Sequence, residues 1–149
     1  MSVTEDRVAA AIGDIHRAGF GETSWLEALR SLADVTGSMG AQLVGFGTHA
    51  AIPFNWIHGL PPEAAEEFAA SGGGDPSVNS RVRIGMSAAE LEVLDETAFT
   101  SAEDARRFPE YGRWLERYDL AAGCLSPLLR RDGLLIGAAL MRNSVQGNV

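Results

Sequence analysis

The first part of the chain carries its apolar residues at the spacing of amphipathic helices. Along residues 5–19 they recur every three or four positions, which predicts one helix. A second stripe of the same period follows, and Ser24 and Glu27 stand three apart at its start, as in a capping box. Gly37 is typical of the position that ends a helix. The apolar positions of the two stripes are Val8, Ile12, Ile15, Trp25, Leu29, Leu32 and Ala33.

The pattern then changes to that of extended strands. Two short apolar and aromatic runs, 41–48 and 51–58, are separated by a brief connection and predict a hairpin. Pro53 has no N–H to donate to a sheet, so we expect the second run at a sheet edge or a bulge.

The C-terminal part predicts a second hairpin. The runs 121–130 and 134–142 flank Asp132-Gly133, a dipeptide that favours a tight turn between strands. Both runs are too continuously apolar to alternate, so we expect central strands that are covered on both faces.

Two further helices are predicted between the hairpins. One covers 61–70 and begins with two prolines, which the first helical turn tolerates. The other is expected to be capped by Ser101 with Asp104, and to bend or restart at Pro109. The stretch 78–99 is ambiguous between helix and strand.

This order of elements predicts an α+β fold. We expect an α-β-α sandwich with a mainly antiparallel sheet of about five strands and helices on its faces. A chain of 149 residues is long enough for one domain with its own core. We therefore expect a single domain over 1–142, and the start of a linker or tail over 143–149.

Charge and cysteine content narrow the set of partners. The chain has 20 acidic and 12 basic residues, a net charge of −8. Such a surface repels phosphate backbones, so the chain itself is not expected to bind nucleic acid. No apolar run approaches the roughly 20 residues that span a bilayer. The single Cys124 fits a reducing compartment, so we expect a cytoplasmic protein without membrane contact.

Three blocks of the sequence resemble the signal-sensing domain of LuxR-type bacterial transcriptional regulators. The first is a tryptophan-led helix that runs into a strand, the second is Gly-Leu-Pro-Pro-Glu followed by Asp-Pro, and the third runs from an aromatic helix to the last hairpin. The matching residues are Trp25, Ala28, Leu29, Leu32, Ala33, Gly37 and Ala41, then Gly59–Glu63, Asp75 and Pro76, and then Phe108, Tyr111, Trp114, Leu115, Leu120, Gly123, Pro127, Asp132, Gly133 and Gly137.

The resemblance implies a GAF- or PAS-like fold in which a small molecule binds between the sheet and one helical layer. It also implies a helix-turn-helix domain downstream of this chain, through which alone DNA would be bound. We further expect the chain to form a homodimer. No cofactor is implied.

The resemblance also bears on the signal. The family's acyl-homoserine-lactone receptors hold the lactone with an aspartate in an Asp-Pro motif and with a tyrosine and a tryptophan on the preceding helix. Asp75 matches that aspartate. Helix 61–70 has neither aromatic residue, however, and Leu125 stands where a hydroxyl side chain is expected. We therefore expect a ligand other than an acyl-homoserine lactone.

The candidate ligand-binding residues are aromatic, with one aspartate, and each has a simpler structural interpretation. Aromatic residues on strands commonly belong to the core, and an aspartate before proline commonly caps a turn. Two aromatic residues three apart on a helix share a face that serves packing or a dimer interface equally well. The candidates are Phe46, Phe54, Trp56, Phe68, Asp75, Tyr111 and Trp114.

The sequence offers no catalytic or metal-binding motif. His16, His49 and His58 have no companions at metal-ligand spacing, and no nucleophile elbow, HExxH or CxxC occurs. Our leading hypothesis is therefore a sensor domain, without enzymatic activity, that binds a small, largely apolar molecule and signals through a dimer. Two alternatives stay open, a dimerisation or protein-interaction module without a ligand and a small enzyme of unrecognised type.

Overall fold

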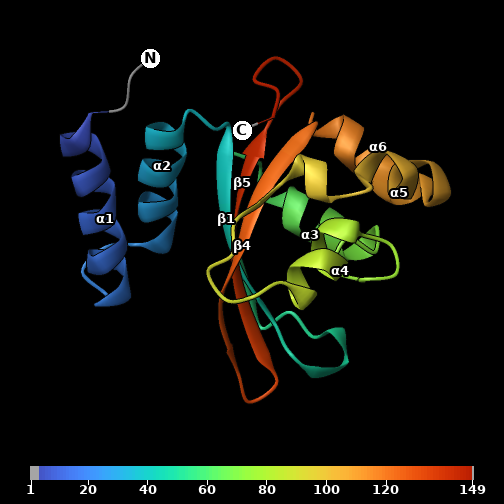
Figure 1. Cartoon of the computed structure of the whole chain (residues 1–149), viewed down its shortest axis with the longest axis horizontal. Helices are drawn as coiled ribbons and strands as arrows, with labels where there is room; N and C mark the ends of the chain where they lie inside the picture. The colour runs from blue at the N-terminus through green and yellow to red at the C-terminus, as the bar shows by residue number, and fades with distance from the viewer. Residues whose placement is uncertain (1–3, 149) are drawn as a thin grey trace.

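The computed structural model describes residues 4–148, which form a five-stranded antiparallel sheet with helices on both faces (Figure 1). The strand order is β2-β1-β5-β4-β3. The strands are β1 (Gly40–Phe46), β2 (Phe54–His58), β3 (Leu94–Asp95), β4 (Ala122–Arg131) and β5 (Leu134–Arg142). The helices are α1 (Glu5–Gly19), α2 (Trp25–Thr36), α3 (Glu63–Ala70), α4 (Ser80–Ser87), α5 (Ser101–Arg107) and α6 (Pro109–Arg117), with short 3₁₀ turns at Thr48–Ala50 and Glu96–Ala98. The predicted α+β class is confirmed.

The two N-terminal helices lie together on one face of the sheet (Figure 1). As predicted, the Glu27 backbone N–H donates to Ser24 Oγ at 3.1 Å, and Gly37 ends α2 in the left-handed conformation at φ 65°. Leu29 and Ala33 of α2 pack against β1 in a compact apolar cluster. Helix α1 packs on α2, so α2 is the helix that joins this pair to the sheet.

The other face of the sheet is covered by α3, α4, α5 and α6 (Figure 1). The largest core cluster lies on this side and is built around the α6 residues Tyr111, Trp114 and Leu115, with Phe68 of α3. Strand residues alternate between the two faces. Thus Val44, which pairs with Gly137, looks toward this layer, while its neighbour Leu43 packs toward α2.

Both predicted hairpins form. Asp132 and Gly133 have φ of 51° and 77°, as a two-residue turn with two left-handed residues requires. Strand β5 lies between β1 and β4, so its prediction as a central strand is confirmed. Strand β2, which follows Pro53, is an edge strand, as expected for a segment that proline keeps out of the sheet interior.

The capping prediction for the fifth helix is wrong. The N-cap of α5 is Thr100 and not Ser101, whose buried hydroxyl has no hydrogen-bond partner within residues 4–148. Asp104 instead accepts a hydrogen bond of 2.8 Å from the backbone N–H of Ser80. The carboxylate therefore joins α5 to the start of α4, a contact between segments that local spacing could not reveal. The predicted restart at Pro109 is confirmed, since α6 begins there.

Residues 143–148 fold back onto the domain. Gln146 Nε2 donates to the Gly37 carbonyl at 2.9 Å, and the Ser144 backbone N–H donates to Asp119 at 3.1 Å. Arg142 Nε donates to the Gly147 carbonyl at 2.8 Å. These bonds connect the end of β5 with α2 on one face and with the loop after α6 on the other.

Candidate functional site

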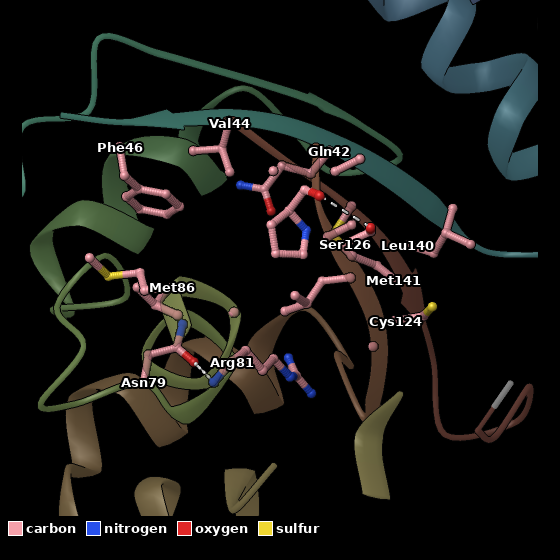
Figure 2. A pocket seen from close by; sticks show the side chains of 18 of the residues that line it. Gln42, Val44, Phe46, Asn79, Arg81, Met86, Cys124, Ser126, Leu140 and Met141 are labelled. Carbon is pink, nitrogen blue, oxygen red and sulfur yellow. Dashed lines mark hydrogen bonds between the residues drawn. The ribbon is translucent and has the colours of Figure 1, made fainter. Parts of the chain in front are cut away.

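A cavity of about 100 Å³ lies between the sheet and the helical layer of α3, α4 and α6 (Figure 2). In Figure 2, Val44 and Phe46 project from β1 toward α4, which contributes Arg81 and Met86, with Asn79 just before it. The large apolar residues whose side chains face this layer and line the cavity are Val44, Phe46, Phe68, Val82, Met86, Trp114, Leu125, Pro127, Leu135 and Met141. The lining is of the mostly apolar kind that suits an apolar molecule.

Small residues on the sheet create the space. Gly137 and Ala139 of β5 and Gly123 of β4 face the helical layer where larger side chains would fill the gap. A Cβ added at Gly137 would meet the Ser126 carbonyl oxygen at 3.7 Å, which is ordinary contact distance. A side chain at this position would therefore enter the cavity without forcing the strands apart.

The side-chain amide of Asn79, in the cavity wall, forms hydrogen bonds through both its oxygen and its nitrogen. Asn79 is buried and caps α4, because its Oδ1 accepts from the Arg81 backbone N–H at 3.0 Å. Its Nδ2 donates to the Gly73 carbonyl at 2.7 Å. Asn79 therefore holds the start of α4 against the glycine-rich turn after α3.

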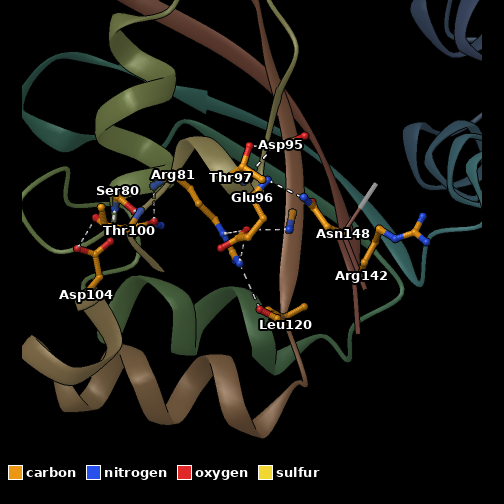
Figure 3. A network of polar contacts seen from close by, with 12 residues as sticks. Ser80, Arg81, Asp95, Glu96, Thr97, Thr100, Asp104, Leu120, Arg142 and Asn148 are labelled. Atoms are coloured by element: carbon orange, nitrogen blue, oxygen red, sulfur yellow. Dashed lines mark hydrogen bonds and ion pairs between the residues drawn. The ribbon is translucent and has the colours of Figure 1, made fainter. Parts of the chain in front are cut away.

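Arg81 and Glu96 form a mostly buried ion pair beside the cavity (Figure 3). Arg81 Nε and Nη2 donate to Glu96 Oε2 at 3.1 and 2.9 Å, and Nη2 also reaches the Leu120 carbonyl at 3.3 Å. The same Glu96 oxygen accepts from the Gly123 backbone N–H at 2.9 Å. The positive charge of Arg81 is thus balanced within the protein, and the pair ties α4 to β4.

Tyr111 is a polar residue of the cavity lining. The side chain is 1% exposed, and its hydroxyl makes no hydrogen bond with any residue from 4 to 148. Burial raises the pKa of Tyr111 to about 12, and the carboxylates of Asp104 and Glu96 act in the same direction against Arg81. The phenol is therefore neutral at physiological pH and is available as a hydrogen-bond donor.

Four of the seven candidate residues come together at the cavity: Phe46, Phe68, Tyr111 and Trp114. Trp114 stands at the centre of this group, since its ring centroid is 5.1 Å from that of Phe68 and 6.2 Å from that of Tyr111. Its indole N–H is already used, because it donates to the Ala64 carbonyl at 3.2 Å. Trp114 can therefore offer a ligand its ring surface but not its N–H.

Phe54 and Trp56 lie away from the cavity, on the α2 side of the sheet. Their rings stack at 4.7 Å between centroids, and Trp56 stacks in turn on Trp25 of α2 at 6.0 Å. Trp56 is 37% exposed. The strand register places both residues on this face of the sheet. Phe54 and Trp56 pair with Gly45 and Leu43, whereas Phe46 belongs to the opposite face. A ligand contact of Phe54 or Trp56 would require a site other than this cavity.

Asp75 is exposed and does not line the cavity. Its Oδ1 accepts hydrogen bonds from the backbone N–H and the hydroxyl of Ser77, at 2.8 and 2.7 Å. These two bonds hold the pKa of Asp75 below its usual value. The carboxylate therefore stabilises the turn before α4, which is the simpler interpretation of an Asp-Pro pair.

We expect Asp75→Ala to lower the free energy of unfolding by about 1 kcal/mol at neutral pH, because the two Ser77 hydrogen bonds are lost. Since the folded pKa lies below the unfolded one, this contribution is complete above the unfolded value and disappears as the pH falls through the folded value. Urea denaturation of both proteins at neutral and acidic pH measures the difference. A difference that persists in acid would contradict the role of the carboxylate.

Helix α4 supplies the part of the cavity that sequence reasoning missed. Residues 78–99 show no clear pattern over their whole length. Within them, however, Val82, Gly85 and Met86 stand at the helical spacing of three and four, and all three line the cavity. Asn79 before them is a preferred N-cap residue. An N-cap residue followed by this helical spacing was the sequence signal from which α4 could have been predicted.

The remaining reactive side chains do not assemble a second site. Cys124 is buried, and burial, with a smaller effect of Asp95, raises the pKa of its thiol, which is the opposite of an activated cysteine. His49 adopts a left-handed turn conformation and His58 ends β2. Across residues 4–148, no three His, Cys, Asp or Glu side chains are grouped so as to hold a metal ion. No helix in that range is long and apolar enough to cross a bilayer.

Comparison with known proteins yields a structural match. No family model matches the chain, and no curated protein matches it. Among solved structures, the chain is similar to the crystal structure of the VqsR LBD domain from Pseudomonas aeruginosa, with a TM-score of 0.63 and 10% sequence identity. The similarity covers 91% of this chain and 80% of that one. At this identity, the two chains share a fold.

Proposed function

We propose that this chain is a signal-sensing regulatory domain of the LuxR type, which binds a small, largely apolar molecule. The observation that carries the proposal is the apolar cavity between the sheet and α3, α4 and α6. The similarity of fold to the ligand-binding domain of VqsR, a LuxR-type regulator, supports it. So does the order of the three sequence blocks that resemble the same family.

The proposal has three further parts. The fold is GAF- or PAS-like, the domain acts in the cytoplasm, and it signals through a homodimer. A ligand can shift such a dimer only by binding one arrangement more tightly than the other. Contact with DNA belongs to a separate helix-turn-helix domain.

An interaction module without a ligand is the second candidate. It is favoured by large apolar side chains that are exposed on and beside the N-terminal helices, where Val8, Ile12, Phe20 and Leu26 are each more than two-fifths exposed. Contiguous exposed apolar surface often marks a protein–protein contact. A binding measurement distinguishes the two candidate functions, because a sensor domain is expected to bind a small molecule in the cavity and an interaction module is not.

We expect Gly137→Val to abolish binding in the cavity and to raise the free energy of unfolding by about 1 kcal/mol, because its methyl groups fill space that is empty at the glycine. The measurement is a thermal-shift screen of the purified protein against a library of small metabolites, with benzene as a reference probe. Any molecule that stabilises the wild type should lose its effect in the variant.

Gly13→Ala is the matched control. A Cβ at Gly13 meets nothing within 4 Å, so this change alters a glycine of α1 without touching the cavity. It should leave every hit of the screen unchanged. If no molecule stabilises the wild type, or if the hits survive in Gly137→Val, ligand binding in this cavity is refuted.

A further inference from the structure

The size of the cavity limits what it can hold. An engineered protein cavity of about 150 Å³ with an apolar lining takes up benzene or xenon. The cavity here measures about 100 Å³ and is also mostly apolar. A single small ring, or a chain of a few carbons, is the size that matches it, whereas a long acyl chain exceeds it.

The polar groups that line the cavity limit which hydrogen bonds a ligand can form there. Gln42 Nε2 donates to Asn55 Oδ1 at 2.6 Å, and Asn79 bonds at both ends of its amide. Trp114 donates to the Ala64 carbonyl. Arg81 is engaged by Glu96 and Leu120. Ser126, which also lines the cavity, has its hydroxyl 3.5 Å from the carbonyl of the adjacent Pro127. The hydroxyl of Tyr111, whose side chain is 1% exposed, makes no hydrogen bond within residues 4–148.

The charges around Tyr111 disfavour an ionic ligand. Arg81 and Glu96 neutralise each other at 2.9 Å, and Asp104 has Arg83 at 3.6 Å. A buried carboxylate or ammonium would therefore find no uncompensated partner, and its desolvation would oppose binding. A neutral acceptor such as a carbonyl, ether or ring nitrogen avoids that cost and satisfies the tyrosine donor.

We propose that the cavity binds an uncharged molecule of about single-ring size that carries one hydrogen-bond acceptor, and that the Tyr111 hydroxyl donates to this acceptor. The inference rests on the proposed function, since it specifies the ligand of the same cavity. In this proposal, Tyr111 makes the cavity bind a molecule with one acceptor atom more tightly than a purely apolar molecule of the same shape. Phe46, Phe68 and Trp114 supply the apolar surroundings.

The test compares benzene with pyridine, which has the same shape and one ring nitrogen that accepts a hydrogen bond. Dissociation constants of both probes are measured at pH 8 by NMR titration of the wild type and of Tyr111→Phe. We expect the variant to bind benzene as the wild type does and to bind pyridine about fivefold to tenfold more weakly. Benzoate, the charged probe, is expected to bind neither protein.

The outcomes distinguish the two proposals. If pyridine loses no affinity in Tyr111→Phe while benzene binds both proteins, the role of Tyr111 is refuted and the ligand cavity stands. If benzoate binds more tightly than pyridine, the uncharged class is refuted. If no probe binds the wild type, the cavity is closed to ligands and both proposals fail. Equal benzene binding by the two proteins also shows that the variant is folded.

Discussion

Replacing Glu96 by alanine is expected to lower the free energy of unfolding by about 3 kcal/mol. The change removes the one carboxylate oxygen that accepts from Arg81 Nε, from Arg81 Nη2 and from the Gly123 backbone N–H (Figure 3). Arg81 and Glu96 are only 16% and 19% exposed, so water cannot fully replace the lost acceptor. Urea denaturation of the wild type and the variant measures the loss.

Two further variants test the cause. Glu110→Ala removes the carboxylate of an exposed pair, in which the side chains of Arg113 and Glu110 are 68% and 74% exposed, and should cost less than about 0.5 kcal/mol. Glu96→Gln keeps an acceptor oxygen without the charge and should fall between these two. Equal losses for Glu96→Ala and Glu110→Ala would contradict a structural role of the mostly buried pair.

Gly59→Ala is expected to be comparably damaging, with a loss of about 3 kcal/mol. Gly59 has φ of +94°, and an added Cβ would lie 2.3 Å from the Met39 carbonyl oxygen and 2.7 Å from the Gly40 Cα. These are backbone atoms of the neighbouring segment, so they cannot move aside as a flexible side chain would. The strain falls where the chain leaves β2 beside the start of β1, so thermal and urea unfolding should both register it.

The variant Gly21→Ala is a control that distinguishes the cost of a positive φ in alanine from the cost of the steric clash at Gly59. Gly21 also has positive φ, at +75°, but a Cβ there meets nothing within 4 Å. This variant should lose only about 1 kcal/mol, the cost of a positive φ for alanine. If it lost as much as Gly59→Ala, close packing at Gly59 would not be the cause.

The local parts of the fold were predictable from the sequence. Gly37 ends α2 and Asp132-Gly133 turns the last hairpin, because each of these needs a left-handed backbone that few residue types adopt. Pro53 indicated an edge strand because it lacks an N–H. Ser101 shows the limit of the same reasoning. Its spacing to Asp104 suits a cap, but the carboxylate instead bonds the Ser80 N–H in a distant segment.

The candidate site was predictable only in part. Phe46, Phe68, Tyr111 and Trp114 do line one cavity. Phe54 and Trp56 have equal aromatic character, but the pairing of β2 with β1 turns them to the α2 face. Since neighbouring strand residues point to opposite faces, the side of the sheet depends on strand register and not on residue type.

The sequence by itself determined the two N-terminal helices, the two hairpins and the net negative charge, because capping, turn chemistry and charge are properties of short segments or of composition. Only the tertiary structure decided where the cavity lies and that the Tyr111 hydroxyl is left without a partner. Both depend on packing between segments far apart in the chain, since Gly137, α4 and α6 must meet before the space between them exists.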